Sequence, residues 1–290
     1  MHKTIIAAAL ASALTVPALT AHAEDAPAAA APAASEHTFT ANVGIYSQYI
    51  FRGLTQTNED PALQGGFDYS HASGLYAGVW ASNISWLRDN NSYKGGGSGE
   101  FDFYAGFKNT IPSTDITYDL GVLQYWYPGS SAAGFVKADT TELYAALGWK
   151  WITAKYSHVV SDKAFGVRDA DGTYYFDLSA AVPLGETGLT VGAHYGWQEF
   201  DGKDKAIAPA GVDNDKVYSY EDWRISLAYD LSKASSSLAG TEIGIMYTDT
   251  SSANKAGYGK TTQIGAGGLS GVYPKNIASD QVTVWLKRTF

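Results

Sequence analysis

The stretch Leu189-Thr190-Val191-Gly192-Ala193-His194-Tyr195-Gly196-Trp197-Gln198 shows the pattern that decides the fold. Every second residue from Leu189 to Trp197 is apolar, and the residues between them are small or polar. A β-strand sorts such a sequence onto two faces, whereas a helix would scatter the apolar residues around its circumference. The stretch is therefore predicted to be a strand with one apolar face and one polar face.

The same alternation recurs from His37 to the end of the sequence. It predicts twelve strands, at about 38–52, 62–70, 75–86, 99–108, 115–127, 139–149, 151–161, 173–183, 188–199, 219–231, 241–250 and 279–290. The connections between them alternate in length. The comparatively short ones are 71–74, 109–114, the junction near 150, 184–187 and 232–240, and the mostly longer ones are 53–61, 87–98, 128–138, 162–172, 200–218 and 250–278.

This organisation is typical of an all-β, transmembrane, antiparallel up-and-down β-barrel with short periplasmic turns and longer extracellular loops. An even number of strands places both ends of the barrel in the periplasm. The alternative is a soluble periplasmic β-sandwich, which would explain the period of two but not the alternating loop lengths. The barrel is the preferred interpretation.

A barrel in hydrocarbon must close, because no water is present to satisfy a free strand edge. The last predicted strand carries an apolar stripe that ends on an aromatic residue, and this stripe is interpreted as the signal read by the outer-membrane assembly machinery: Val282, Val284, Leu286 and Phe290. Arg288 interrupts the stripe. We expect its basic side chain to reach the periplasmic headgroup zone.

Aromatic residues crowd the predicted strand ends and resemble the two girdles of membrane barrels. On the extracellular side they are Tyr49, Phe51, Trp86, Tyr125 to Tyr127, Trp197, Tyr220 and Trp223, and on the periplasmic side Tyr69, Phe107, Trp149, Trp151 and Tyr229.

The first 23 residues read as an export signal. A short basic start precedes an apolar run, and the tripeptide Ala21-His22-Ala23 is a cleavage pattern that predicts processing after Ala23. Residues 24–36 form an Ala/Pro-rich periplasmic lead-in, and 37–290 the outer-membrane barrel. No later segment offers the roughly 20 apolar residues of a membrane helix. The predicted location is the outer membrane of a Gram-negative bacterium.

Composition excludes several classes of function. The chain has no cysteine, so it can form neither a disulfide framework nor a thiolate metal site. The formal charge of −9 falls to −10 when the predicted signal, with one lysine and no acid, is removed. An acidic chain of this kind is a poor partner for nucleic acid. No cofactor and no metal site are expected, and the expected partners are outer-membrane lipids, lipopolysaccharide, the assembly machinery and small solutes.

Three segments near the start of the barrel resemble the TorF family of porins. They are Tyr46-Ser47-Gln48-Tyr49-Ile50-Phe51-Arg52-Gly53-Leu54-Thr55-Gln56, then Pro61 to Tyr69, then Gly74 to Asn83. The first matches the family pattern S-x-Y-x-F-R-G-x-[ST]-Q, and an acidic strand equivalent to Glu100-Phe101-Asp102 follows. The resemblance covers the mature chain from about Phe39. It implies a porin-like outer-membrane protein and brings no substrate.

If the apolar parity faces lipid, the other parity lines the interior. The candidate pore-lining residues are Arg52, Asp68, Glu100, Asp102, Asp119, Glu142, Lys155, Asp177, His194, Arg224, Asp230 and Glu242. They could pair across a plugged or narrow lumen, or line an aqueous path. The modest acidic excess suggests, as a hypothesis, a weak preference for cations. Twelve strands leave less room than the 16–18 of general porins, so any pore is expected to be small.

Arg52 is predicted to end the first strand at the outer rim. There it would contact headgroups or an acidic loop, or it would form a mouth residue that attracts anionic groups. The longest loop, 250–278, is expected to be a mobile surface loop, with an inward constriction as the alternative. The acids Asp201, Asp204, Asp213 and Asp215 of another loop do not have EF-hand spacing, so a solvated acidic loop is preferred to a divalent-cation site.

The function predicted from the sequence is passive passage of ions or small polar solutes. A non-conducting structural or adhesion barrel is the second class. A lipid hydrolase is the third, because some twelve-stranded barrels carry a Ser-His pair on the outer wall. His158 has the lipid-facing parity, but its expected neighbours are Thr141 or Asp139 and Tyr174, and no serine is within reach. The chain is therefore predicted not to be an enzyme, with no catalytic residues.

Overall fold

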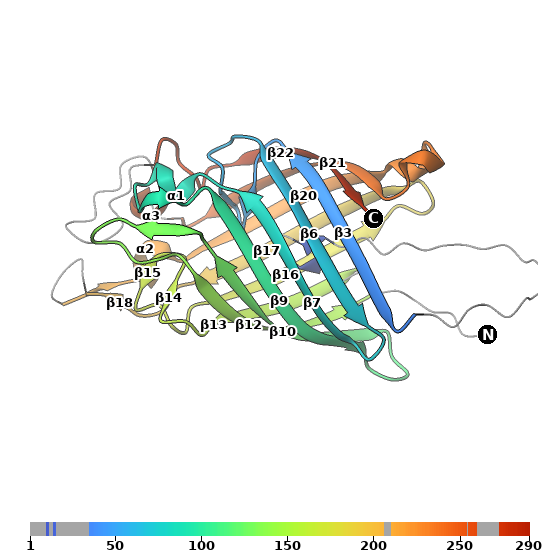
Figure 1. Ribbon diagram of the computed structural model, residues 1–290, viewed down its shortest axis with the longest axis horizontal. Coiled ribbons are helices and arrows are strands. Elements are labelled where there is room, and N and C mark those ends of the chain that lie inside the picture. The colour runs from blue at the N-terminus through green and yellow to red at the C-terminus, as the bar shows by residue number, and fades with distance from the viewer. Residues whose placement is uncertain (1–9, 12–13, 16–34, 206–209, 254, 260–272) are drawn as a thin grey trace, which may run out of the picture.

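A closed antiparallel β-barrel makes up most of the structure (Figure 1). The computed structural model describes residues 10–11, 14–15, 35–205, 210–253, 255–259 and 273–290. The barrel strands are β3 (His37–Tyr46), β6 (Ala62–His71), β7 (Leu75–Asn83), β9 (Gly99–Thr110), β10 (Ile116–Trp126), β12 (Thr140–Trp149), β13 (Ile152–Val159), β16 (Tyr174–Pro183), β17 (Leu189–Glu199), β20 (Tyr220–Asp230), β21 (Thr241–Ser251) and β22 (Gln281–Thr289). Each strand pairs with the next along the chain, and β22 pairs with β3, so the predicted fold class is confirmed.

The first predicted strand is the one whose bounds were wrong. It was expected to run from 38 to 52, but β3 ends at Tyr46. The chain then turns into the barrel and forms a short hairpin from β4 (Ile50–Phe51) and β5 (Leu54–Thr55). The other eleven strands begin and end within three residues of the predicted bounds.

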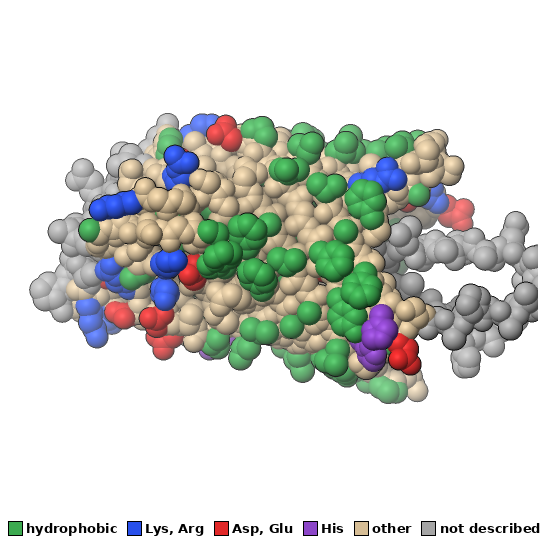
Figure 2. Space-filling model, viewed as in Figure 1, with side chains coloured by type: hydrophobic (Ala, Val, Ile, Leu, Met, Phe, Trp, Pro, Cys, Tyr) green, Lys and Arg blue, Asp and Glu red, His purple; other side chains and the backbone are tan. Residues whose placement is uncertain are grey.

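The two faces of the wall differ in polarity as the alternation predicts. In β17, Val191 is 41% exposed on the outside, whereas His194 and Gln198 are 8% and 2% exposed on the inside. Figure 2 shows apolar side chains scattered over the barrel wall, with most of the visible lysine, arginine and acidic side chains toward one end and a few at the other. An apolar outer surface is stable in the hydrocarbon of a membrane, and the closed ladder of backbone hydrogen bonds leaves no strand edge unpaired. In the described part of the chain no helix is both long and apolar enough to cross a membrane.

The two ends of the barrel differ in their connections. The short connections lie at the end of the barrel where β3 starts and β22 stops, here called the turn end. The longest of these short connections contains the 3-10 turns η1 (Leu231–Lys233) and η2 (Ser236–Leu238). The long connections lie at the opposite, loop end. They contain β4, β5, α1 (Trp86–Asp89), β8 (Tyr93–Gly96), β11 (Gly129–Ser131), β14 (Lys163–Ala164), β15 (Val167–Arg168), β18 (Lys203–Asp204), β19 (Val212–Asp213), α2 (Asp215–Tyr218) and α3 (Lys255–Tyr258).

The predicted signal peptide and lead-in are described only in small part. Two short strands, β1 (Leu10–Ala11) and β2 (Leu14–Thr15), pair with each other. The rest of the predicted signal, with the Ala23 cleavage point, and the lead-in up to residue 34 lie outside the described residues. Export and processing stay predictions.

The closing seam joins β22 to β3. Five residue pairs form the strand register, from Trp285 opposite Tyr46 to Thr289 opposite Asn42. Beyond them the Phe290 amide donates to the Ala41 carbonyl at 2.8 Å. Val282, Val284, Leu286 and Phe290 are all about half exposed or more on the outer face, as predicted, and the Arg288 guanidinium lies 5.4 Å from the Phe290 ring centroid.

The buried aromatic residues gather at the loop end and inside the barrel. This corrects the predicted extracellular girdle, because several of its members face inward and are at most 8% exposed: Tyr49, Phe51, Trp86, Tyr125, Tyr127 and Tyr220. Trp126, on the opposite parity to Tyr125 and Tyr127, is 42% exposed on the outside. At the turn end the predicted periplasmic girdle agrees better with the structure, because Trp149 and Trp151 are about half exposed on the outer face.

Candidate functional site

The lumen of the barrel is crossed by the β4–β5 hairpin, here called the lumen hairpin (residues 50–55). Its two-residue turn is Arg52-Gly53, both with positive φ (46° and 78°). A Cβ atom added to Gly53 would lie 2.6 Å from the Asp222 Cβ of β20 and 2.8 Å from the Thr250 Cγ2 of β21. The tip therefore rests against the barrel wall and leaves no space for a side chain at Gly53.

Arg52 is the charged group at the tip of the lumen hairpin. Its guanidinium donates to both carboxylate oxygens of Glu142 on β12, at 2.8 and 2.9 Å, and to the Gln198 side chain on β17 at 2.8 Å. The Tyr175 ring of β16 lies 4.2 Å from the guanidinium carbon. The Arg52 and Glu142 side chains are 2% and 1% exposed. The predicted position of Arg52 at the outer rim was wrong, because the chain leaves the wall after Tyr46.

The base of the lumen hairpin is held on both sides. The Tyr49 hydroxyl donates to Glu100 of β9 at 3.0 Å, and the Tyr49 ring packs edge-on against Trp80 of β7. On the other side the Gln48 amide donates to Gln281 of β22 at 3.0 Å. The Thr55 amide donates to the Ile277 carbonyl at 2.9 Å. The hairpin thus joins distant strands through the interior and occupies the loop-end half of the lumen.

Two buried acids and a buried lysine lie inside the barrel, on strands β9 and β13. Glu100 and Asp102 of β9 are 1% and 2% exposed, and Asp102 Oδ1 has no hydrogen-bond partner among the described residues. Lys155 of β13 is buried, with its Nζ 4.1 Å from the centroid of the Tyr144 ring. All three were predicted to line the pore, and the structure places them inside the barrel as predicted.

His194 lies between two buried carboxylates. Its Nδ1 is 2.8 Å from Asp177 and its Nε2 is 2.8 Å from Asp222. The Tyr175 hydroxyl donates to the second oxygen of Asp222 at 2.7 Å, which links this group to the ring that packs on Arg52. Asp222 was not among the predicted pore-lining residues. Its parity is that of Arg224 on the same strand, so the alternation alone was enough to include it.

The turn-end half of the lumen is more accessible. Asp68 and Asp119 are half-buried; they accept hydrogen bonds from Tyr104 and Tyr76, the latter at 2.6 Å. Near the turn end, Glu242 lies 3.1 Å from Lys287 and accepts a hydrogen bond from Trp285.

Two further predicted pore-lining residues lie on β20. Arg224 is half-buried and helps to line a residual cavity of about 20 Å³ beside Arg52 and His194. Asp230 stands at the end of the strand, where both its oxygens accept hydrogen bonds from Ser232 and cap the turn η1. Asp230 is therefore a capping residue, not part of the deep lumen. The sequence could not show this, because the cap depends on where β20 ends.

Above the lumen hairpin the loops pack into an aromatic layer. A cavity of about 60 Å³ remains between residues that include Trp86, Phe165, Phe200, Tyr218, Tyr258 and Tyr273. The Tyr258 hydroxyl donates to the Tyr218 carbonyl at 2.5 Å, and the Asn90 amide donates to the Tyr273 hydroxyl at 3.1 Å. Burial raises the pKa of Tyr273 to about 12, so its phenol stays neutral at physiological pH.

The predicted loop 250–278 contributes to this layer. Its described parts, including 255–259 and 273–278, reach inward, with Tyr258, Tyr273 and Ile277 buried. The expected surface loop was therefore wrong for those parts, and the inward alternative describes them. Residues 254 and 260–272 lie outside the described residues.

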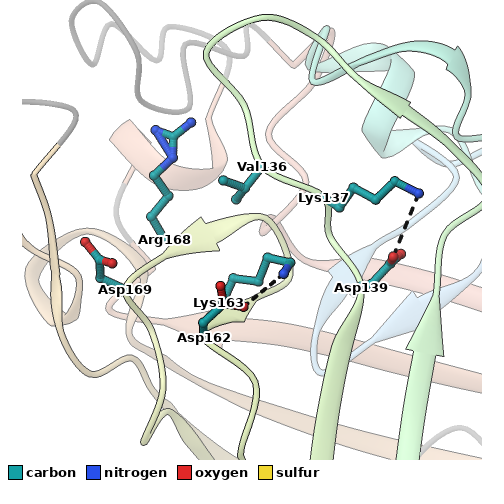
Figure 3. A pocket seen from close by; sticks show the side chains of 7 residues that line it. All are labelled: Val136, Lys137, Asp139, Asp162, Lys163, Arg168 and Asp169. Carbon is teal, nitrogen blue, oxygen red and sulfur yellow. Dashed lines mark hydrogen bonds and ion pairs between the residues drawn. The ribbon is translucent and has the colours of Figure 1, made fainter.

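An open cleft of about 390 Å³ lies between two loops at the loop end (Figure 3). Its lining includes equal numbers of basic and acidic side chains: Val136, Lys137, Asp139, Asp162, Lys163, Arg168 and Asp169. Lys163 pairs with Asp162 at 2.9 Å and Lys137 with Asp139 at 3.9 Å. Such exposed pairs are screened by water, so the cleft presents no strong field of either sign.

Two lysines of the acidic loop at 200–218 pair with one of its acids, Asp213. Asp213 lies 3.0 Å from Lys216 and 3.1 Å from Lys203, and hydrogen bonds from these lysines lower the Asp213 pKa. Asp204 is buried. Lys216 and Lys203 occupy the Asp213 oxygens that a cation would need, whereas the buried Asp204 is not solvated as predicted.

His158 lies on the outer wall, as predicted. Its cross-strand neighbours are Leu143 on β12 and Tyr174 on β16, so the expected neighbour Thr141 was wrong by one pleat. The Tyr156 hydroxyl lies 3.3 Å from its Nδ1. Neither strand neighbour of His158 is a serine.

A family model described as "Bacterial protein of unknown function (Gcw_chp)" matches residues 30–290. No curated protein matches the chain.

Among solved structures, the "KdgM porin" is 8% identical, with 87% of this chain and 99% of that chain covered and a TM-score of 0.48. The "NanC porin" is 11% identical over 87% and 99% of the two chains, with a TM-score of 0.46. The outer membrane protein OprD from Pseudomonas aeruginosa is 11% identical over 80% and 59%, with a TM-score of 0.40. Each likeness concerns the barrel fold and nothing further.

Proposed function

We propose that this chain, which belongs to the Gcw_chp family, is a porin-like channel of the bacterial outer membrane whose lumen is narrowed by its own first loop. Ions or small polar solutes would pass through it. The observation that carries the proposal is the buried contact of Arg52 with Glu142, inside a closed barrel that is apolar outside and polar inside. The finer identification with TorF porins belongs to this proposal, and it rests on the stretch 46–56, which contains the lumen hairpin.

The polarity of the interior favours a channel over a purely structural barrel. A barrel that needed only a filled core could use apolar side chains, which avoid the desolvation cost of buried ions. This lumen instead holds Glu100, Asp102, Asp177 and Asp222 beside basic groups. Charged side chains inside a membrane barrel are typical of a path for polar solutes.

The lumen hairpin favours a restricted channel over a wide one. The hairpin contacts β12, β16, β17 and β20, Tyr49 at its base contacts β7 and β9, and together they occupy the loop-end half of the interior. The half nearer the turn end keeps half-buried acids such as Asp68 and Asp119. Passage would therefore require the hairpin to move, or it would use the small gaps beside it.

The same hairpin is the observation that favours the second candidate, a non-conducting structural or adhesion barrel. A lumen filled permanently at the loop end would carry no current. A lipid hydrolase is not proposed, because His158 has Leu143 and Tyr174 as its strand neighbours.

A weak cation preference is the finer part of the proposal. Acids outnumber bases among the inward-facing groups, and Asp222 adds to the acidic side. A low-dielectric wall focuses such a field on the ions inside. Export after cleavage at Ala23, contact of the outer wall with membrane lipids and lipopolysaccharide, and recognition of the stripe that ends on Phe290 by the assembly machinery complete the proposal.

Single-channel recording separates the two candidates. The protein is purified from outer membranes and reconstituted in planar bilayers, in its natural form and with residues 49–56 replaced by a short Gly-Ser link. We expect small conductance steps from the natural chain and steps several times larger from the variant. Silence from both, while both shift on a gel when heated as folded barrels do, would establish the non-conducting alternative. Reversal potentials in a salt gradient measure the selectivity, and clear anion selectivity would contradict the cation preference.

A further inference from the structure

Two histidines and a glutamate gather at the turn end, outside the lumen. Glu36, His37 and His71 each offer one ligand atom, and these atoms lie within 4.8 Å of one another. His37 and His71 are directly opposite across the β3–β6 pair. Figure 2 shows histidine side chains beside an acidic side chain at this end of the barrel.

The two rings are already spaced for a shared metal ion. Their centroids are 5.1 Å apart. Two imidazoles bound to one tetrahedral Zn²⁺, at Zn–N distances of about 2.0–2.1 Å, have centroids roughly 5 Å apart. The three ligand atoms would need to approach to about 3.4 Å of one another, which exposed side chains can achieve by small rotations.

The other ring nitrogen of each histidine is held by a hydroxyl group. His37 Nδ1 lies 2.9 Å from the Tyr69 hydroxyl. His71 Nδ1 lies 2.8 Å from the Ser73 hydroxyl and accepts a hydrogen bond from the Ser73 amide at 3.1 Å. Hydroxyl oxygens can accept the Nδ1 proton of a metal-bound imidazole and so fix its orientation. On His37 the ligand atom is then Nε2. On His71, ligation through Nε2 requires Nδ1 to lose the hydrogen bond from the Ser73 amide and to donate to the Ser73 hydroxyl instead.

We propose that Glu36, His37 and His71 bind one divalent transition-metal ion of the Zn²⁺ class, with water in the fourth position. Two imidazole nitrogens and a carboxylate oxygen are a donor set suited to such ions. The ion would tie the segment that enters β3 to the β6–β7 turn, where the Ala72 amide already donates to the Glu36 carbonyl at 2.8 Å. The site lies on the outward parity of Phe39, so it does not depend on the channel proposal.

Calorimetric titration with ZnCl₂ tests the site. The protein is purified from outer membranes with a tag that contains no histidine, stripped with a chelator and titrated in detergent. Variants His37→Ala, His71→Ala and Glu36→Gln are compared with His158→Ala, which removes an outer-wall histidine from another part of the barrel. Heat-modified migration on gels confirms that each variant is a folded barrel.

The expected result is one Zn²⁺ per barrel. His37→Ala and His71→Ala should each weaken binding at least tenfold, Glu36→Gln should weaken it less, and His158→Ala should leave it unchanged. The absence of saturable binding to the natural chain would overturn the proposal. Equal affinities of the natural chain and both histidine variants would overturn it too, because the metal would then lie elsewhere.

Discussion

Replacing Arg52 with alanine is the sharpest test of the restricted-channel proposal. The substitution removes two hydrogen bonds to Glu142, one to Gln198 and the packing on Tyr175. It also leaves the Glu142 carboxylate, 1% exposed, without its cation. We expect the lumen hairpin to spend far more time away from its docked position.

The magnitude follows from the burial of both charges. Removing one partner of a buried ion pair costs about 3–5 kcal/mol. Since each 1.4 kcal/mol is about a factor of ten, the docking equilibrium should fall by roughly a hundredfold to several thousandfold. In single-channel records this predicts that the larger conductance level, brief or absent in the natural chain, becomes the dominant level in Arg52→Ala.

Two further variants distinguish the loss of the Arg52–Glu142 ion pair from a nonspecific effect of the substitution on the barrel. Arg52→Ala combined with Glu142→Ala removes the unpaired carboxylate, so it should return part of the docking. Arg168→Ala removes the same charge from an exposed loop and should resemble the natural chain. Natural conductance and dwell times in Arg52→Ala barrels that are folded, as judged by heat-modified migration, would refute the reasoning.

The remaining predictions concern the turn, the charge of the lumen and the closing seam. Gly53→Ala should loosen the hairpin and raise the conductance, because its Cβ would lie 2.6 Å from the Cβ of Asp222; a natural single-channel record would contradict this. Asp102→Asn should reduce any cation preference, and an unchanged reversal potential would mean that Asp102 does not face the ion path. Deletion of Phe290, whose amide bonds to the β3 backbone, should lower the assembled fraction in membranes more than Arg288→Ala does. Equal membrane levels of these two variants would count against the role of Phe290 in assembly.

The wall of the barrel could be predicted because most wall residues obey one local rule, with exceptions such as Arg288 and His158. Each strand must place apolar side chains in hydrocarbon and polar ones inside, so a period of two persists wherever the chain crosses. The pairing of β22 with β3 follows from the same physics, since a free edge is too costly. These requirements act on neighbours in the sequence, which is why the twelve strands could be counted.

The lumen hairpin could not be predicted in this way. The alternation of β3 is interrupted after Tyr46, since Ser47 stands on the apolar parity and Ile50 on the polar parity, but neither residue by itself marks a turn into the lumen. The partners that stabilise the inward path, Glu142 and Gln198, are distant in the sequence. One local signal was present, because Arg52-Gly53 can form the tight turn with positive φ that a hairpin requires.

Two other errors were avoidable from parity alone. Tyr125 and Tyr127 share a face that is opposite to Trp126, so all three could not belong to one outer girdle. Asp222 lies two residues before Arg224 and had to face the same way. In both cases residue type was given more weight than the position on the strand.

The chemistry of the lumen hairpin indicates why a charged contact would suit a movable constriction. An apolar tip would lose its burial on moving into water, and the full hydrophobic cost would oppose opening. A buried ion pair has already lost its hydration, so Arg52 and Glu142 would regain favourable solvation as they separate. The net cost of opening is then smaller than the attraction within the docked pair. Loss of one partner has a much larger effect than reversible opening, because the other charge stays buried and unpaired. We infer that the pair favours a single docked position while keeping the hairpin able to leave it.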